Sequence, residues 1–260
     1  MRKLYFTTGS PFARAVRIVL AEKGLPFERD ETYTTPSVEE RARVSPTLQV
    51  PTLVDGDLRL WDSSVILEYL MATYPNAPAP AGHPPFAEAY VRPDHPWKDR
   101  LVHATLQTLG ASTATVSQLQ WAGIRHEENG HGSRCAARNQ HLLDWFEAEL
   151  AGVGEGFVPG VVSVQDVMLT AWCEFIERRP LRLTWRAAHR PKLEALVRRL
   201  RERPSFRQEP VLWWEPGVTY ASPEEVAWAA AKTVDRGPGF AEWRAARSTG
   251  PEGAGYQRSP

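Results

Sequence analysis

The chain has few cysteines, no excess of charge of either sign and no long apolar run. Cys135 and Cys173 occur without a Cys-x-x-Cys pair or a His/Cys zinc pattern, so neither a disulfide framework nor a structural metal is predicted. Lys and Arg total 31, as do Asp and Glu, so no basic field attracts nucleic acid or an anionic membrane. The N-terminus enters a strand pattern without the apolar core of a signal peptide or a membrane span. We expect a cytoplasmic protein with neither nucleic acid nor membrane as partner.

Proline and tryptophan, in contrast, are plentiful. Seven prolines fall between residues 75 and 96, a composition that cannot continue a helix and marks a domain boundary. A length of 260 residues also favours two domains over one. Several of the ten Trp residues lie late in the chain. We predict a first domain at 1–76, a linker at 77–96, an all-α domain at 97–205 and a Trp-rich extension at 206–260.

The first 76 residues alternate between strand and helix patterns. Apolar residues at helical spacing between residues 12 and 23, followed by Gly24, predict a first helix. The Asp55-Gly56-Asp57 turn predicts a hairpin. The expected strands are 3–7, 27–32, 51–55 and 58–61, and the expected helices are 12–23, 37–44 and 62–75. The order β-α-β-α-β-β-α is that of a thioredoxin-like α/β domain.

Helical patterns dominate the second domain, at 97–124, 134–150, 164–177 and 190–203. The segment from Val162 to Val167 has the form of a capping box. In such a box the Ser163 hydroxyl accepts the N–H of Asp166, and the Asp166 carboxylate reaches back to the cap. This box predicts the start of a helix at Val164.

The polar run between the first two of these helices holds His126, Glu127, Glu128 and His131. Two His and two Glu residues permit a metal site. The glycines and the lack of a helical pattern leave such ligands unorganised, so we interpret the run as a solvated interhelical loop without a metal.

Two short stretches carry the chemistry. Gly9-Ser10 stands where a strand pattern gives way to a helix, so free backbone N–H groups and the positive helix end point at a bound anion. The second stretch places Val50-Pro51 ahead of a short strand and Asp62-Ser63 at the start of another helix. It predicts a second anion site.

These two stretches, together with Ser163-Val164-Gln165-Asp166, resemble the glutathione transferase family over residues 1–205. The resemblance implies a thioredoxin-like α/β N-terminal domain followed by an all-α C-terminal domain. It also implies glutathione as co-substrate, a small apolar electrophile as second substrate, and a homodimer.

Ser10 is the expected catalytic residue. It stands where redox members of the fold carry a cysteine, so disulfide exchange is excluded there. Lowering a thiol pKa of about 8.5 by about two units requires about 2.7 kcal/mol. One hydrogen bond to a charged group supplies about 1.5–3 kcal/mol, and a helix end adds about 0.3–1. A donor at Ser10 is therefore sufficient to stabilise a glutathione thiolate.

The resemblance also assigns the binding of glutathione. Val50, ahead of a cis Pro51, offers its backbone to the cysteinyl part. Ser63 holds the γ-glutamyl carboxylate, and Asp62, shorter than the Glu or Gln usual there, meets the amine. Gln49 faces the glycyl carboxylate, where many members have a basic residue.

Candidates for the second-substrate pocket are Phe12, Trp97, Gln118, Trp121 and Trp214. Arg14 lies one helical turn after Ser10 and either adds positive potential near the sulfur or is a surface residue. The late Trp residues either cover the helical domain or wall the pocket.

The leading hypothesis is thus a serine-type glutathione transferase that conjugates or thiolyses an apolar electrophile. Ether cleavage, dehalogenation and isomerisation all remain open as reaction subtypes. The alternative is a non-catalytic, transferase-like module that binds partners or ligands.

Overall fold

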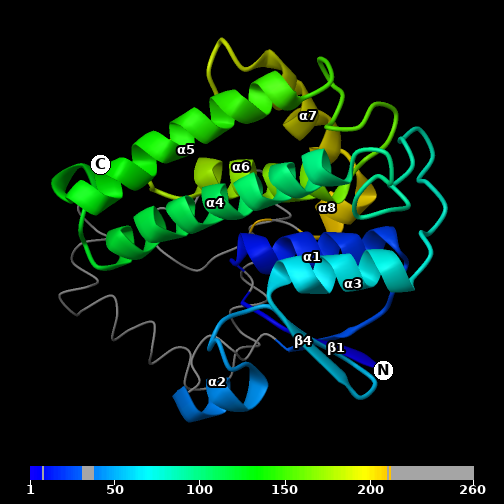
Figure 1. The fold of residues 1–260 in the computed structure, drawn as a ribbon. Coiled ribbons are helices and arrows are strands. Elements are labelled where there is room, and N and C mark those ends of the chain that lie inside the picture. The colour runs from blue at the N-terminus through cyan, green and yellow to red at the C-terminus, as the bar shows by residue number, and fades with distance from the viewer. Residues whose placement is uncertain (8, 31–37, 210, 212–260) are drawn as a thin grey trace.

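The structure, a computed structural model, describes residues 1–7, 9–30, 38–209 and 211 (Figure 1). Among these residues, the N-terminal part builds a sheet of four strands. They are β1 (Arg2–Tyr5), β2 (Glu28–Asp30), β3 (Thr52–Asp55) and β4 (Leu58–Trp61), in the order β2-β1-β3-β4. Strand β1 runs parallel to β2 and antiparallel to β3, and β4 is antiparallel to β3. This is the expected thioredoxin-like arrangement.

Helices α1 (Pro11–Glu22) and α3 (Ser63–Thr73) lie between this sheet and the helical domain, whereas α2 (Val38–Val44) lies away from that domain (Figure 1). The sequence explains the position of α1. Ser10 caps it, Pro11 supplies the fixed φ that suits a first helical position, and apolar residues recur at helical spacing. Leu4 and Leu53 of the sheet and Ile18 of α1 are fully buried, so one apolar layer joins the sheet to its covering helices.

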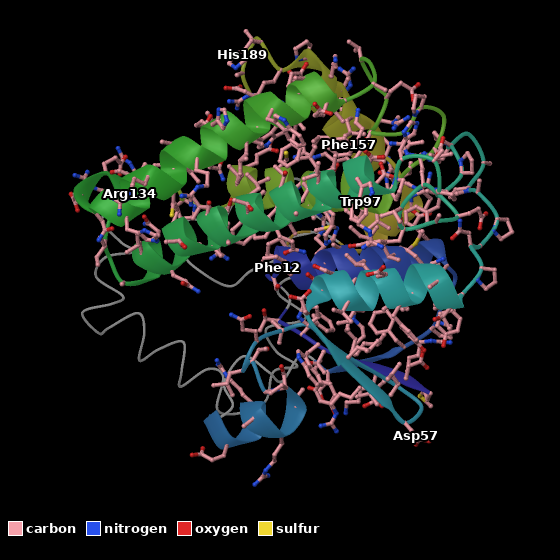
Figure 2. All side chains as sticks on the ribbon, viewed as in Figure 1. Phe12, Asp57, Trp97, Arg134, Phe157 and His189 are labelled. Carbon is pink, nitrogen blue, oxygen red and sulfur yellow. The ribbon has the colours of Figure 1, made fainter. Side chains whose placement is uncertain are left out.

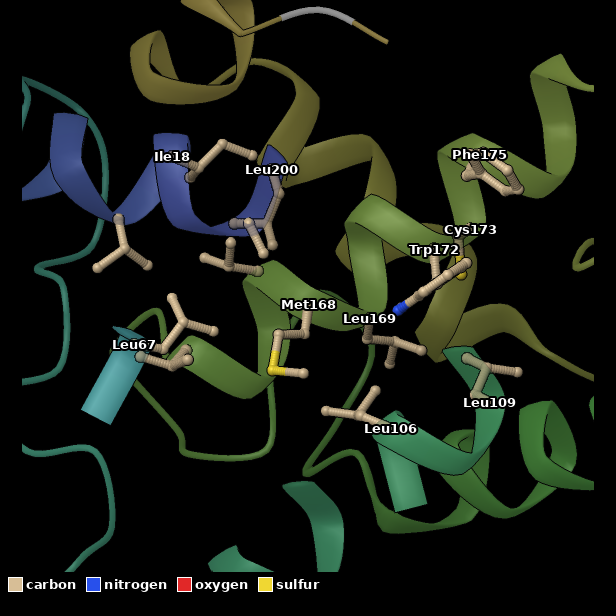
Figure 3. Packing of buried hydrophobic residues seen from close by; sticks show 14 of the residues in the cluster. Ile18, Leu67, Leu106, Leu109, Met168, Leu169, Trp172, Cys173, Phe175 and Leu200 are labelled. Carbon is tan, nitrogen blue, oxygen red and sulfur yellow. The ribbon is translucent and has the colours of Figure 1, made fainter. Parts of the chain in front are cut away.

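The C-terminal part is helical: α4 (Pro96–Trp121), the short η2 (His126–Glu128), α5 (Gly130–Glu149), α6 (Val164–Arg178), α7 (Pro191–Arg201) and α8 (Pro204–Gln208). Helix α6 is buried along almost its whole length and packs against both α1 and α4. Figure 3 shows Met168, Leu169 and Trp172 of α6 among apolar side chains from several elements. The core of the two domains is therefore continuous through α6.

The capping box at the start of α6 is confirmed. Asp166 N donates to Ser163 Oγ at 3.1 Å, and Ser163 N donates to Asp166 Oδ2 at 2.8 Å. The structure adds a third bond, in which Phe157 N donates to Asp166 Oδ1 at 2.9 Å. A Cβ at Gly156 would overlap this carboxylate, so the glycine gives the loop room to approach it. Asp166 thus caps α6 and also holds the preceding loop, at Phe157, against the start of that helix.

The interhelical loop differs from the expectation. Helix α5 begins at Gly130, not at 134, because Asn129 Oδ1 accepts the N–H groups of His131 and Gly132 at 3.0 and 2.9 Å. Gly132 belongs in this helix because a Cβ there would lie 2.7 Å from Leu119 Cδ1. Part of the run therefore forms a close helix contact. Within the described ranges, no three metal-ligating side chains form a cluster.

The helix expected to reach residue 124 ends at Trp121, since Gly123 adopts a left-handed φ of 73°. The expected domain end at residue 205 falls inside α8. Phe206 and Glu209 are buried, so the packed body continues to Glu209. No helix in the described part of the chain is long and apolar enough to cross a membrane.

Candidate functional site

One edge of the sheet gathers the two stretches that the sequence singled out. Tyr5 ends β1, Thr52 begins β3 and Trp61 ends β4, and the ladder pairs Tyr5 with Thr52 and Thr52 with Trp61. The segments that continue from these three ends are the Ser10 turn, the Val50-Pro51 bond and the Asp62 cap. Residues far apart in sequence therefore meet at the same edge.

Ser10 is the N-cap of α1, as predicted. Its Oγ accepts the N–H of Ala13 at 3.3 Å, and its own N–H donates to Thr7 O at 3.1 Å. The side chain is half-buried. A hydroxyl that accepts a backbone bond keeps its own proton to donate, and the positive end of α1 lies behind it. This position suits stabilisation of an anion. Thr8, another hydroxyl residue of this stretch of sequence, lies outside the described residues.

The peptide bond between Val50 and Pro51 is cis, as expected. Val50 is half-buried and Pro51 is buried, whereas Gln49 is exposed. Leu48 just before them has a left-handed φ of 58°, and its N–H donates to Ser45 O at 3.1 Å. The chain therefore turns sharply into β3 and leaves the backbone of Val50 at the sheet edge.

Asp62 caps α3 with a φ of 70°, and its Oδ1 accepts the N–H of Ser64 at 2.7 Å. Asp62 is exposed and Ser63 is only 4% exposed. Sequence reasoning missed the next residue. Ser64 Oγ accepts a bond of 2.5 Å from Gln107 Nε2 of α4, so the helical domain reaches this site directly. No local motif signals a contact between residues so distant in sequence.

An apolar wall stands next to the Ser10 turn. The rings of Phe12 and Trp172 meet edge to face with centroids 4.8 Å apart. A Cβ at Gly110 of α4 would lie 2.9 Å from Phe12 and 2.7 Å from Trp172, so the glycine permits this close packing. Figure 2 shows Phe12 where α1 meets the helical domain. Phe12 is half-buried beside the Ser10 turn and is thus placed to line a pocket, whereas Trp172 is 1% exposed and supports Phe12 from the core.

The other pocket candidates are less closely tied to this wall. Trp97 is 76% exposed in the first turn of α4, about 20 Å along the helix from Gly110. Gln118 is an exposed residue near the other end of that helix. Trp121 is the last residue of α4, and its side chain lies outside the described structure. Trp214 also lies outside the described residues.

Arg14 is not a surface residue, so that alternative is wrong. It is 3% exposed, its Nη1 pairs with Glu174 Oε2 at 2.5 Å, and its Nε donates to Glu209 O at 2.5 Å. Its charge is compensated by α6. Arg14 therefore joins the two domains.

Comparison with known proteins identifies the family. A model of the glutathione S-transferase N-terminal domain matches residues 4–78. A probable glutathione S-transferase of Oryza sativa subsp. indica is 30% identical over 178 residues, which cover 65% of this chain and 72% of that protein. The chain therefore belongs to the glutathione S-transferase family.

The solved structure of a glutathione S-transferase from Methylobacterium radiotolerans, in complex with glutathione sulfonate, superposes with a TM-score of 0.63. It is 26% identical, and the match covers 85% of this chain and 96% of that one. The thioredoxin-like domain followed by a helical domain is thus confirmed.

A third relative carries a different kind of name. A stringent starvation protein A homolog of Haemophilus influenzae is 40% identical over 120 residues, covering 42% of this chain and 53% of that protein. The chain spans between a third and about half of the length of such homologs.

Proposed function

We propose that this protein is a glutathione transferase in which Ser10 stabilises the glutathione thiolate for attack on a small apolar electrophile. The observation that carries the proposal is the sheet edge. It gathers the Ser10 cap, the cis Val50-Pro51 bond and the Asp62 cap, the three elements to which the family resemblance assigns glutathione binding.

In this proposal glutathione lies along that edge in an extended form. Its γ-glutamyl end reaches Asp62 and Ser63, and its cysteinyl part pairs with the backbone of Val50. Its glycyl carboxylate lies near Gln49. The family relationship and the glutathione sulfonate in the Methylobacterium radiotolerans structure support glutathione as the co-substrate of this chain.

Ser10 then donates its hydroxyl proton to the sulfur in a hydrogen bond, and the amino terminus of α1 adds its positive potential. The thiol proton leaves to solvent. The thiolate sulfur then bonds to the electrophilic carbon of a substrate that rests against Phe12. The bond from that carbon to its leaving group breaks, and the leaving group departs with the electron pair. An apolar wall beside the sulfur favours an apolar second substrate.

We also propose a cytoplasmic homodimer. Cys135 and Cys173 are buried free thiols, as suits a compartment in which glutathione keeps thiols reduced. Trp97 and Leu101 are 76% and 65% exposed on successive turns of α4, and Val65 of α3 is 48% exposed. These side chains offer an apolar surface to a second copy.

The substitution Ser10→Ala tests the mechanism. Glutathione binding should persist, because it is spread over Val50, Asp62 and Ser63. The pKa of the bound thiol should rise by about one to two units, as expected for the loss of about 1.5–3 kcal/mol of charged hydrogen bond. Turnover at neutral pH should fall and partly recover in alkaline solution.

Ultraviolet difference titration of bound glutathione measures that pKa directly. Ser133→Ala is the control, because Ser133 is an exposed serine in α5 whose hydroxyl donates to His126 O. If the pKa of the bound thiol is the same in Ser10→Ala as in the parent, Thr8 or backbone N–H groups stabilise the thiolate instead of Ser10.

A second candidate is a non-catalytic, transferase-like binding module. The similarity to proteins named stringent starvation protein A homologs supports it. Binding to immobilised glutathione, followed by a screen of electrophiles, separates the two. If the protein binds glutathione without lowering the thiol pKa and turns over no electrophile, the non-catalytic function is correct.

A further inference from the structure

A polar contact crosses the domain boundary beside the candidate glutathione site. Ser64 takes part twice: its N–H donates to Asp62 Oδ1 at 2.7 Å, and its Oγ accepts from Gln107 Nε2 at 2.5 Å. The first bond fixes the Asp62 carboxylate on the start of α3. The second fixes the start of α3 on α4. Ser64 therefore links the orientation of Asp62 to the helical domain.

Gln107 is itself held by a buried network. Its Nε2 lies 3.3 Å from His103 Nε2, one turn earlier in α4. The Tyr90 hydroxyl lies 2.7 Å from His103 Nδ1 and 2.8 Å from His103 Nε2. The backbone carbonyl of Tyr90 accepts from Gln165 Nε2 of α6 at 3.1 Å. His103, Tyr90 and Gln165 are each less than 10% exposed. The network thus joins α3, α4, the linker and α6 through neutral polar groups.

The hydrogen bonds of this network do not change with pH where glutathione ionises, because His103 and Tyr90 stay neutral there. Burial lowers the pKa of His103 to about 4, although the nearby Asp62 charge opposes the fall. Burial also raises the pKa of Tyr90. Both groups are therefore neutral over the pH range in which a glutathione thiol ionises, and the hold on Gln107 does not change with pH in that range.

We infer that Gln107 is a positioning residue for glutathione, because it fixes Ser64 and thereby the Asp62-Ser63 cap that receives the γ-glutamyl end. This inference rests on the proposed function. Gln107 does not lie at the sulfur, so it acts on binding and not on the thiolate. Gly110 lies one turn further along the same helix and packs against Phe12, so α4 contacts both the γ-glutamyl side and the apolar wall.

A double-mutant cycle on Ser64 and Gln107 tests this role. Gln107→Met keeps the length and volume of the side chain and removes its donor, and Ser64→Ala removes the acceptor. Each should weaken glutathione binding by about five- to tenfold, the effect of one lost hydrogen bond. The double variant should bind no worse than either single variant, because all three lack the same contact.

Isothermal titration calorimetry measures the affinity, and ultraviolet titration measures the pKa of the bound thiol, which should stay unchanged. KM for glutathione should rise while kcat at saturation holds. Thr108→Val is the matched control: Thr108 is the next residue of α4, it is exposed, and its hydroxyl bonds to Ala104 O in its own helix. That variant should bind glutathione like the parent.

The outcomes of these measurements distinguish a failure of the positioning role from a failure of the proposed function. If the parent binds glutathione and Gln107→Met binds it equally well, the positioning role is wrong and the proposed function stands. Additive losses in the double variant would also overturn the role. If the parent binds no glutathione, both proposals fail. Should Gln107→Met not fold, Ser64→Ala decides alone, since an unchanged affinity there excludes the link.

Discussion

The cap of α1 and the rest of that helix hold their polar groups in opposite ways. At the amino-terminal end, Ser10 is half-buried and accepts one bond of 3.3 Å. Further along, Arg14, Arg17 and Glu22 are 1–6% exposed, and each pairs with a group from the C-terminal helices or the chain just after them. The contrast shows that this helix separates its two tasks. Its buried length pairs every charged side chain within the fold, and its half-buried start holds the Ser10 hydroxyl that we propose as the donor to the thiolate.

Because the ion pair at the carboxyl-terminal end of α1 is buried, breaking it should lower the stability of the fold strongly. Arg203 Nε and Nη2 donate to the two oxygens of Glu22 at 2.5 and 2.7 Å, and the Ser205 hydroxyl donates to the same carboxylate. A charge taken out of water must be compensated by good geometry and further hydrogen bonds. Glu22 has both, so its removal leaves Arg203 buried without its counter-charge.

The largest expected effect is therefore that of Glu22→Ala. Breaking this buried pair should lower the free energy of unfolding by about 3–5 kcal/mol. Urea denaturation followed by circular dichroism measures the loss. Glu202→Ala is the control, since Glu202 pairs with Arg207 on the surface, where such pairs contribute about 1 kcal/mol or less. Equal losses in the two variants would remove the distinction between the paired interior and the surface.

A smaller effect should follow from pH, through Glu209. Arg17 Nε donates to this carboxylate at 2.7 Å and Arg29 Nη1 at 2.6 Å, so Glu209 joins the chain after α8 to α1 and β2. Burial alone would raise the pKa of Glu209, but Arg17 and Arg29 outweigh it and lower that pKa below its usual value of 4.5. The ionised carboxylate thus stabilises the fold above pH 4.5, and this contribution is lost as pH falls through the lowered pKa.

The comparison of the parent with Glu209→Gln isolates this contribution. The difference in their unfolding free energies should be constant from about pH 8 to pH 5 and should shrink as pH falls below 4.5. Other ionised carboxylates titrate in both proteins, so their effects cancel in the difference. Urea denaturation at a series of pH values measures it. A difference that stays constant to pH 3 would mean that Glu209 is not held ionised by its arginine partners.

The sequence predicts some of these features and misses others for a physical reason. The cap at Ser10 and the box at Ser163 follow from residues that lie next to one another, so their patterns are visible in the chain, whereas the cis bond before Pro51 was expected from the resemblance to the family. Glu209 lies 192 residues from Arg17. No local pattern marks such a pair, and a domain end placed at residue 205 therefore cut through α8.

The candidate site shows the same division. Its helix starts at Ser10 and Asp62 are marked by local residues, whereas its position where three strands end was expected from the resemblance to the glutathione transferase family. The contacts from the helical domain could not be predicted, because Gln107 and Trp172 carry no motif of their own. Their roles depend on how α4 and α6 cross the N-terminal domain, which is a property of the packed core.

The smallest expected effect on stability is that of Ser10→Ala. The serine cap of α1 can be compared directly with that of α6, because Ser163 is 3% exposed and its Oγ accepts the buried N–H of Asp166. Ser163→Ala should lower the unfolding free energy by about 1–3 kcal/mol, since a buried donor is left without a partner. Ser10→Ala should lower it by only about 0.5–1 kcal/mol, because its bond is long and the turn is partly open to water.

Urea midpoints of the two variants, measured together, test this ordering. A loss at Ser10 as large as that at Ser163 would mean that the hydroxyl is committed to capping α1, and the open end of the helix would then hold no spare donor. A small loss combined with a raised pKa of the bound thiol means the opposite. The Ser10 hydroxyl then contributes little to the fold and most of its hydrogen-bonding capacity to the thiolate, as the comparison of the cap of α1 with the rest of that helix requires.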